Sequence, residues 1–104
     1  MRAISECIQN ALKLRFPRSN FTAYFEYLKT CPELSKGTEG TEEHHIIPVS
    51  VLTNYNGKLY ELHQHSPENK IVLFKADHDT AHLLLGKAEP WLLRTGRRAR
   101  GLTK

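Results

Sequence analysis

The feature that most constrains the fold is a short β-rich run that leads directly into a helical pattern. The run Lys70–Phe74 consists mainly of β-branched, aromatic and other apolar residues, and the turn-forming stretch 66–69 precedes it. A helix is predicted over residues 76–85, because the acidic Asp77 suits a first turn and Gly86 lies just past the expected end. This part of the chain is therefore predicted to be a strand followed by a helix.

Two amphipathic patterns near the N-terminus predict two further helices. Apolar residues recur three and four positions apart over residues 4–12, and Pro17 ends this pattern. Ser19 or Asn20 can cap a second helix, which closes before Pro32. The apolar positions of the second helix are Phe21, Tyr24, Phe25 and Leu28. Both apolar faces are interpreted as parts of a core.

The predicted elements are joined by one polar loop and one long connection. The polar stretch 32–43 separates the helices from a short strand predicted over 44–48. A long connection follows, in which Asn56-Gly57 is a turn-forming pair. The predicted order is thus two helices, strand, long loop, strand and helix.

Length and composition are those of one small globular domain. The 104 residues suffice for one modest core, and 39% hydrophobic with 25% charged residues is ordinary for such a domain. No apolar run approaches the roughly 18 residues of a membrane span, and no secretory leader pattern is present. We therefore expect a cytoplasmic protein without membrane contact. Cys7 and Cys31 are too few for a disulfide framework, and both are interpreted as reduced core residues.

The distribution of charge suggests a polyanionic partner. The formal net charge is +4, and residues 94–104 hold basic side chains without an acidic one. By contrast, residues 33–43 hold four glutamates and one lysine. A basic tail of this kind is typical of nucleic-acid contacts, and a solvated terminus explains the charge pattern equally well.

Four of the six histidines fall into two clusters. His78 and His82 are four positions apart on the predicted helix, so their imidazoles share one face at a spacing that one metal ion can bridge. Two exposed helix histidines are the simpler interpretation of that pair alone. His44 and His45 are neighbours in a predicted strand and should face opposite ways. One of them facing a metal ion and the other facing a substrate is the natural arrangement.

Taken together, these residues resemble the HNH endonuclease family, also called the ββα-metal or His-Me finger. The resemblance is carried by His44-His45-Ile-Ile-Pro48, then the run Asn69–Leu73, then His78 and His82, in the order that the family has. It covers about residues 42–87, and the run from Asn69 looks most like small phage and intron-borne homing endonucleases. Two departures are the lack of paired C-x-x-C zinc motifs and the length of the connection before Asn69.

The resemblance implies a role for each matching residue. His45 matches the general base that takes a proton from the attacking water. His44, His78 and His82 match the positions that hold one divalent ion, which would stabilise charge on the phosphate oxygens. Asn69 matches the residue that holds the base histidine in place through hydrogen bonds. The expected products are 5′-phosphate and 3′-hydroxyl ends.

The identity of the ion stays open at this point. Three imidazoles favour Zn²⁺, Ni²⁺ or Mn²⁺ over Mg²⁺, whereas the family commonly cleaves with Mg²⁺ or Mn²⁺. The role of two further histidines in the long connection, His63 and His65, is also open, since they could contact DNA or simply face solvent.

The predicted architecture is one α+β domain over residues 1–104. Two N-terminal helices (1–31) pack on an HNH finger (42–87), and a basic segment (88–104) follows. Because the finger lacks a bracing zinc, the helices are expected to support it. DNA phosphates are expected to be contacted by basic side chains around the finger and in the tail. These are Lys70, Lys75, Lys87, Arg94, Arg97, Arg98, Arg100 and Lys104.

The predicted function is a metal-dependent DNA endonuclease that nicks or cuts duplex DNA, of a phage or mobile-element type, acting in the host cytoplasm. Two alternatives remain. One is a non-catalytic, metal-stabilised DNA-binding module, and the other is a toxin-type or RNA-directed nuclease. A homodimer would be needed for a concerted double-strand cut if each chain carries one site.

Overall fold

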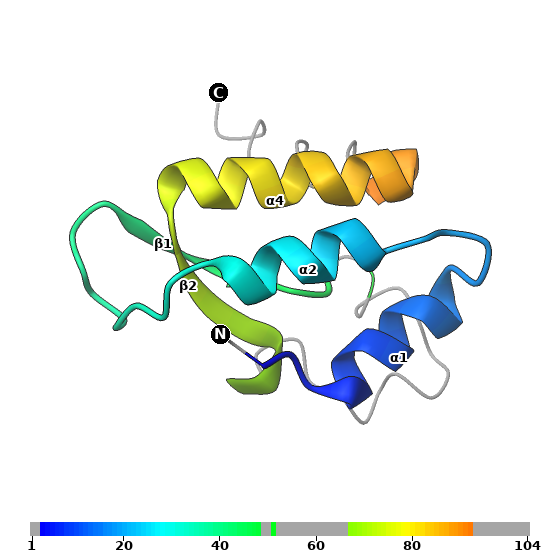
Figure 1. The fold of residues 1–104 in the computed structure, drawn as a ribbon, viewed down its shortest axis with the longest axis horizontal. Coiled ribbons are helices and arrows are strands. Elements are labelled where there is room, and N and C mark those ends of the chain that lie inside the picture. Colours follow the sequence, from blue (N-terminus) through cyan, green and yellow to red (C-terminus); the bar gives the residue numbers. More distant parts are fainter. Residues whose placement is uncertain (1–2, 49–50, 52–66, 93–104) are drawn as a thin grey trace.

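A computed structural model of the protein describes residues 3–48, 51 and 67–92, and the account that follows concerns these residues. They form a small α+β domain in which helices pack around a two-stranded antiparallel sheet. Helix α2 lies alongside α4, and α1 crosses below them (Figure 1). The elements are α1 (Glu6–Arg15), α2 (Thr22–Thr30), β1 (Thr41–His45), the 3₁₀ turn η2 (Pro67–Asn69), β2 (Lys70–Phe74) and α4 (Lys75–Ala88).

The two N-terminal helices lie where the apolar patterns predict them. In α1, the side chain of Ser5 accepts a hydrogen bond from the backbone N–H of Cys7, and the helix ends before Pro17. In α2, the N-cap residue is Phe21 rather than Ser19 or Asn20, and no side chain caps the helix from that position. Asn20, one residue earlier, still accepts the N–H of Thr22 through its Oδ1. Cys31 is buried as expected, but Cys7 is exposed and the prediction for it was wrong. The buried face of α1 consists of Ile8, Ala11 and Leu12, and Cys7 lies outside it.

The strand Lys70–Phe74 is confirmed as β2, whereas its partner differs from the prediction. The first strand was expected over 44–48 and instead spans Thr41–His45, with register from Thr41 opposite Phe74 to His45 opposite Lys70. Beyond His45, the N–H of Ile46 still bonds to the backbone carbonyl of Asn69, and Ile47 then bonds to the Asn69 side chain instead of a strand partner. The predicted polar loop is correspondingly shorter, and Gly37 and Gly40 adopt positive φ angles there.

Helix α4 is longer than predicted. It runs from Lys75 to Ala88 rather than over 76–85, and Gly86 is a buried residue inside it rather than a residue past its end. The stop signal is Pro90, because the residue before a proline disfavours helical angles and Glu89 is extended (φ −148°, ψ 102°). Pro90 then begins a further helical segment, described as far as Leu92.

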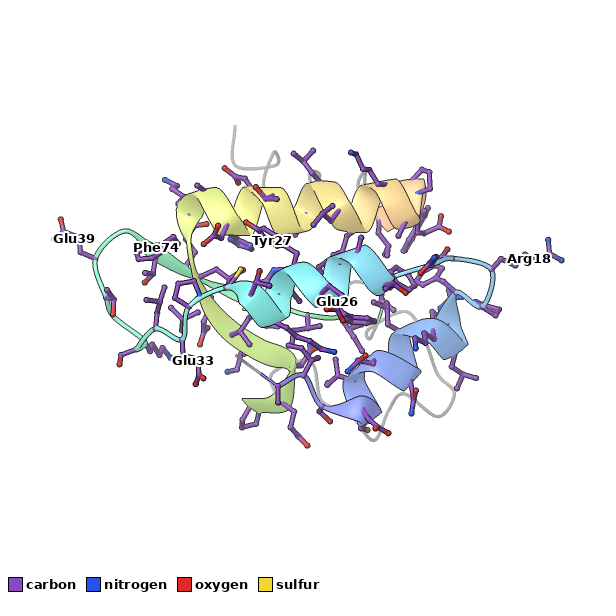
Figure 2. The ribbon with its side chains drawn as sticks, in the orientation of Figure 1. Arg18, Glu26, Tyr27, Glu33, Glu39 and Phe74 are labelled. Carbon is purple, nitrogen blue, oxygen red and sulfur yellow. The ribbon has the colours of Figure 1, made fainter. Side chains whose placement is uncertain are left out.

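One apolar core joins the N-terminal helices to the sheet and to α4. The fully buried residues include Ile8 and Leu12 of α1, Leu28 of α2, Leu73 of β2 and Leu85 of α4. Figure 2 shows Tyr27 between α2 and α4, where its hydroxyl donates to Asp77 Oδ1 at 2.6 Å. This hydrogen bond, with desolvation adding to it, raises the pKa of Tyr27 to about 12. The N-terminal helices were expected to support the strand–helix segment, and α2 does so by packing against α4.

Several predictions fall outside the described residues. They concern the Asn56-Gly57 turn, the histidines at 63 and 65, and the basic residues of the tail from 94 to 104. Among the helices that the structure describes, none is long and apolar enough to cross a membrane.

Candidate metal centre

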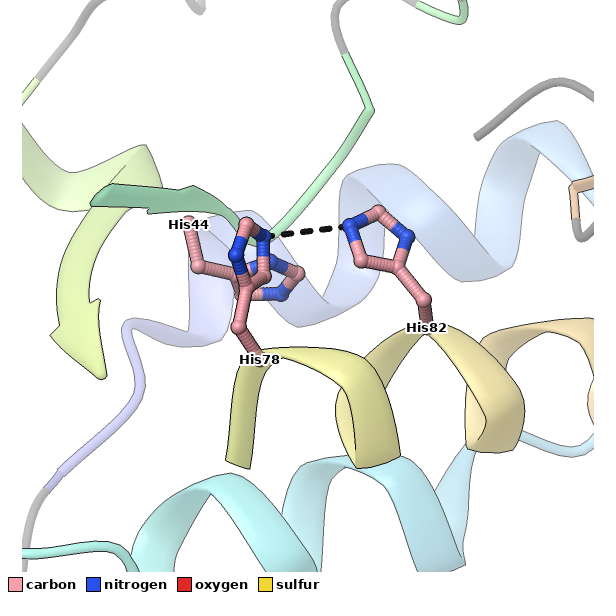
Figure 3. A group of neighbouring side chains, drawn as sticks. All are labelled: His44, His78 and His82. Carbon is pink, nitrogen blue, oxygen red and sulfur yellow. Dashed lines mark hydrogen bonds between the residues drawn. The ribbon is translucent and has the colours of Figure 1, made fainter. Parts of the chain in front are cut away.

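Three histidines meet where β1 faces α4. His44 lies near the end of β1, and His78 and His82 lie one turn apart on α4, which begins directly after β2. One ligand nitrogen from each lies within 4.8 Å of the others (Figure 3). The ring centroid of His44 is 5.0 Å from that of His78 and 5.3 Å from that of His82. The spacing on the helix and the antiparallel pairing of the strands together bring these side chains to one point.

His44 is the buried member of the group. Its side chain is 0% exposed, and its Nε2 lies 2.7 Å from the hydroxyl oxygen of Tyr24 on α2. Its other nitrogen, Nδ1, is buried without a hydrogen-bond partner among the described residues. A buried polar atom left unpaired costs about 1–3 kcal/mol, so this nitrogen needs a partner, and a metal ion or an ordered water can supply one.

Burial also sets the charge of His44. Desolvation lowers the pKa of His44 well below its ordinary value, and the neighbouring His78, His82 and His45 lower it further. The imidazole is consequently neutral at physiological pH. Neutral imidazole is the form that binds metal ions.

His78 is oriented by a carboxylate. Its Nδ1 lies 2.7 Å from Glu42 Oε1, and its Nε2 lies 3.1 Å from His82 Nε2. A carboxylate oriented toward one ring nitrogen fixes the proton there and directs the other nitrogen to a metal ion, an arrangement that recurs in metal sites. Glu42 therefore holds the His78 ring so that Nε2 faces the centre of the group.

The donor set fits one divalent ion. Ligand nitrogens about 2.0–2.1 Å from a tetrahedral zinc lie roughly 3.4 Å apart, so the contact between His78 and His82 already has nearly that spacing. The same spacing for all three nitrogens requires the 4.8 Å group to contract by roughly 1.4 Å when the ion binds. Three protein ligands leave a coordination position open, as in catalytic sites, whereas structural zinc sites normally use four protein ligands.

His45 does not belong to this group. It follows His44 on β1, and adjacent side chains of a strand point to opposite faces of the sheet. It is half-buried and lies opposite Lys70 in the register of the two strands. Its role as general base stays a prediction.

Asn69 binds the backbone just after the two histidines. Its side chain is 0% exposed, its Oδ1 accepts the N–H of Ile47 at 2.8 Å, and its Nδ2 donates to the carbonyl of Ile47 at 3.1 Å. Its own carbonyl accepts the N–H of Ile46 at 2.8 Å. The backbone bond continues the register of the two strands by one residue, and the two side-chain bonds fix the path of the chain beyond His45.

We expect Asn69→Ala to lower the free energy of unfolding by roughly 2–6 kcal/mol, because two buried backbone groups of Ile47 lose their partners at about 1–3 kcal/mol each. Urea denaturation measures the loss. Asn20→Ala is the matched control, since it removes an exposed hydrogen bond to the backbone of Thr22 worth about 1 kcal/mol. Equal losses in the two variants would contradict the role given to the Asn69 bonds.

The sequence analysis did not identify Tyr24 and Glu42 as parts of the site. Tyr24 was interpreted only as a core residue and Glu42 only as part of an acidic stretch. A signal for Glu42 exists, because it stands two positions before His44 and so shares its face of the strand. The signal for Tyr24 is weaker, since a buried tyrosine hydroxyl needs a polar partner but the sequence does not say which one.

The predicted DNA contacts are only partly described. Lys75 and Lys87 are exposed on α4, and Lys70 is half-buried. The described residues contain more acidic than basic side chains, so the positive net charge of the protein comes from the remaining segments.

Comparisons of the chain with protein-family models, curated proteins and solved structures found no match. The function is therefore argued from the residues of the site itself.

Proposed function

We propose that this protein is a metal-dependent DNA endonuclease of the HNH type, with residues 42–87 as its finger. The observation that carries the proposal is the buried Nδ1 of His44, which has no hydrogen-bond partner in the part of the chain that the structure describes and lies in a group of three imidazoles. Support also comes from the order of the elements, since β1, β2 and α4 follow one another as strand, strand and helix. The group would hold the ion with His44 on the strand and His78 and His82 on the helix.

When bound, a divalent ion would supply positive charge beside the phosphodiester and stabilise the charge that develops on its oxygens. Proton transfer, positioning of the base and binding of the phosphate are the work of the protein's own residues. An unprotonated ring nitrogen of His45 takes the proton of the attacking water. Asn69 holds the backbone beyond His45 so that this imidazole keeps its position. Lys70, opposite His45 in the sheet, contributes a positive charge next to the bound phosphate.

A plasmid-cleavage assay tests the proposed activity. We expect supercoiled DNA to be nicked or cut when Mg²⁺, Mn²⁺, Zn²⁺ or Ni²⁺ is added and to stay intact in EDTA. His82→Ala should remove the activity, and Leu83→Ala, an exposed neighbour on the same helix, should leave it unchanged. DNA that stays intact with every ion would instead favour the metal-stabilised binding module. Preference for RNA over duplex DNA would favour the RNA-directed alternative.

Metal binding should also be visible as a gain in stability. A ligand at 100 times its dissociation constant stabilises the folded state by about 2.7 kcal/mol, which for a chain of this size raises Tm by roughly 10–20 °C. Differential scanning calorimetry with and without the ion measures the shift. We expect His82→Ala to lose most of it and Leu83→Ala to retain it. An equal shift in both variants would place the ion elsewhere.

A further inference from the structure

A tyrosine from the N-terminal half of the chain reaches the metal centre. Tyr24 on α2 is 1% exposed, and its hydroxyl oxygen lies 2.7 Å from two atoms, Nε2 of His44 and the carbonyl oxygen of Ile46. Both contacts are buried, and both join α2 to the segment that contains the two adjacent histidines.

The single proton of this hydroxyl determines the protonation pattern of His44. A carbonyl oxygen can only accept, so the hydroxyl must donate its proton to Ile46. Toward His44 the hydroxyl oxygen can then only accept. The short contact with Nε2 therefore requires a proton on Nε2. In a neutral imidazole with Nε2 protonated, Nδ1 carries the lone pair. Nδ1 is also the buried atom for which residues 3–48, 51 and 67–92 provide no hydrogen-bond partner.

We propose that Tyr24 is a positioning residue that makes Nδ1 the metal-binding atom of His44. The inference rests on the proposed metal centre and adds the residue that sets its ligand geometry. Without the hydroxyl, the Nε2–H of His44 and the carbonyl of Ile46 both lose their buried partner. The ring then has no reason to keep its proton on Nε2, and the form with the proton on Nδ1 cannot bind an ion through that atom.

The chain offers a matched control one turn along the same helix. Tyr27 also lies on α2 and also uses its hydroxyl to donate a hydrogen bond, but its acceptor is Asp77 rather than a group at the histidine cluster. Tyr24→Phe and Tyr27→Phe thus each remove one hydroxyl and keep the ring. The ring of Tyr24 packs edge-on to His44 with centroids 6.1 Å apart, and phenylalanine preserves that contact.

The experiment uses the full chain labelled with ¹⁵N at histidine, first without metal and then with Zn²⁺. Long-range ¹H–¹⁵N spectra of the imidazoles identify the protonated nitrogen of each ring. We expect the wild-type protein to show His44 protonated at Nε2 before the ion is added and bound through Nδ1 afterwards. A wild-type protein with the proton on Nδ1 would overturn the proposal, and this measurement needs no variant to fold.

Zinc affinity of the variants provides the second measurement. Loss of an outer partner of a metal ligand typically costs about 10–100-fold in metal affinity, and we expect that loss in Tyr24→Phe, together with a mixed tautomer signal for His44. Tyr27→Phe should bind zinc like the wild type. Equal affinities in the two variants would overturn the role of Tyr24. Failure of the wild type to bind any ion would overturn the proposed function and this inference with it, whereas equal affinities in two zinc-binding variants would overturn the inference alone.

Discussion

Replacing His45 with alanine is expected to slow DNA cleavage by about 10²–10⁴-fold while metal affinity and DNA affinity stay nearly unchanged. A general base acts on the proton that moves in the transition state and contributes little to binding of the ground state. His45 is suited to this separation because it is not one of the three grouped imidazoles, and adjacent side chains of a strand face opposite sides of the sheet. Single-turnover cleavage rates at saturating protein measure the effect.

The contrast with the metal ligands makes this prediction specific. His78→Ala should weaken ion binding, measured by calorimetric titration, and should lose activity that a higher ion concentration partly restores. His45→Ala should bind the ion normally and should not be restored in this way. Equal losses of ion affinity in the two variants would show that His45 is a ligand and that the base has been assigned to the wrong residue.

Removal of residues 95–104 is expected to weaken binding to all DNA sequences alike and to flatten its salt dependence. Each neutralised phosphate contributes about −0.9 to the slope of log affinity against log salt, so four contacts give a slope near −4. The truncation removes Arg97, Arg98, Arg100 and Lys104, and the slope should fall in magnitude by about three units. The described residues carry no net positive charge to take its place, because acidic side chains outnumber basic ones among them.

Fluorescence anisotropy at several salt concentrations measures both quantities. The matched control is the full-length chain with the same four residues changed to glutamine, which should reproduce the truncation if charge rather than chain length is responsible. Unchanged affinity and slope in both proteins would exclude the tail as a contact and would move DNA binding to the N-terminal helices.

Elements with local signals were predicted well from the sequence. The amphipathic spacing in α1 and α2 and the β-rich run of β2 depend on neighbouring residues, and the structure has all three where they were expected. The bounds of β1 depend on its pairing with β2, which lies far away along the chain. Residues 46 and 47 have strand-like composition, but their backbone groups bond to Asn69, and no pattern of neighbouring residues predicts this.

The candidate site, too, could be predicted only where its signals lie in neighbouring residues. The spacing of His78 and His82 on one helix face is a local feature, and the resemblance joined them to His44, which the structure brings to the same point. The residues behind them were not predicted. Glu42 and Tyr24 act on atoms of other elements, through contacts that span 36 and 20 positions of the sequence. A pattern search along the chain has no access to such pairs.

The contacts of α2 also determine the smallest segment that could be transferred to another protein with the candidate site intact. A fragment starting at residue 42 would retain all three candidate ligands, yet it would uncover the apolar face of α4 around Ala81 and Leu85. It would also leave His44 Nε2 without the Tyr24 hydroxyl. A graft of this strand–helix segment onto another scaffold would therefore have to include α2, or the scaffold would have to place another tyrosine hydroxyl next to His44 Nε2.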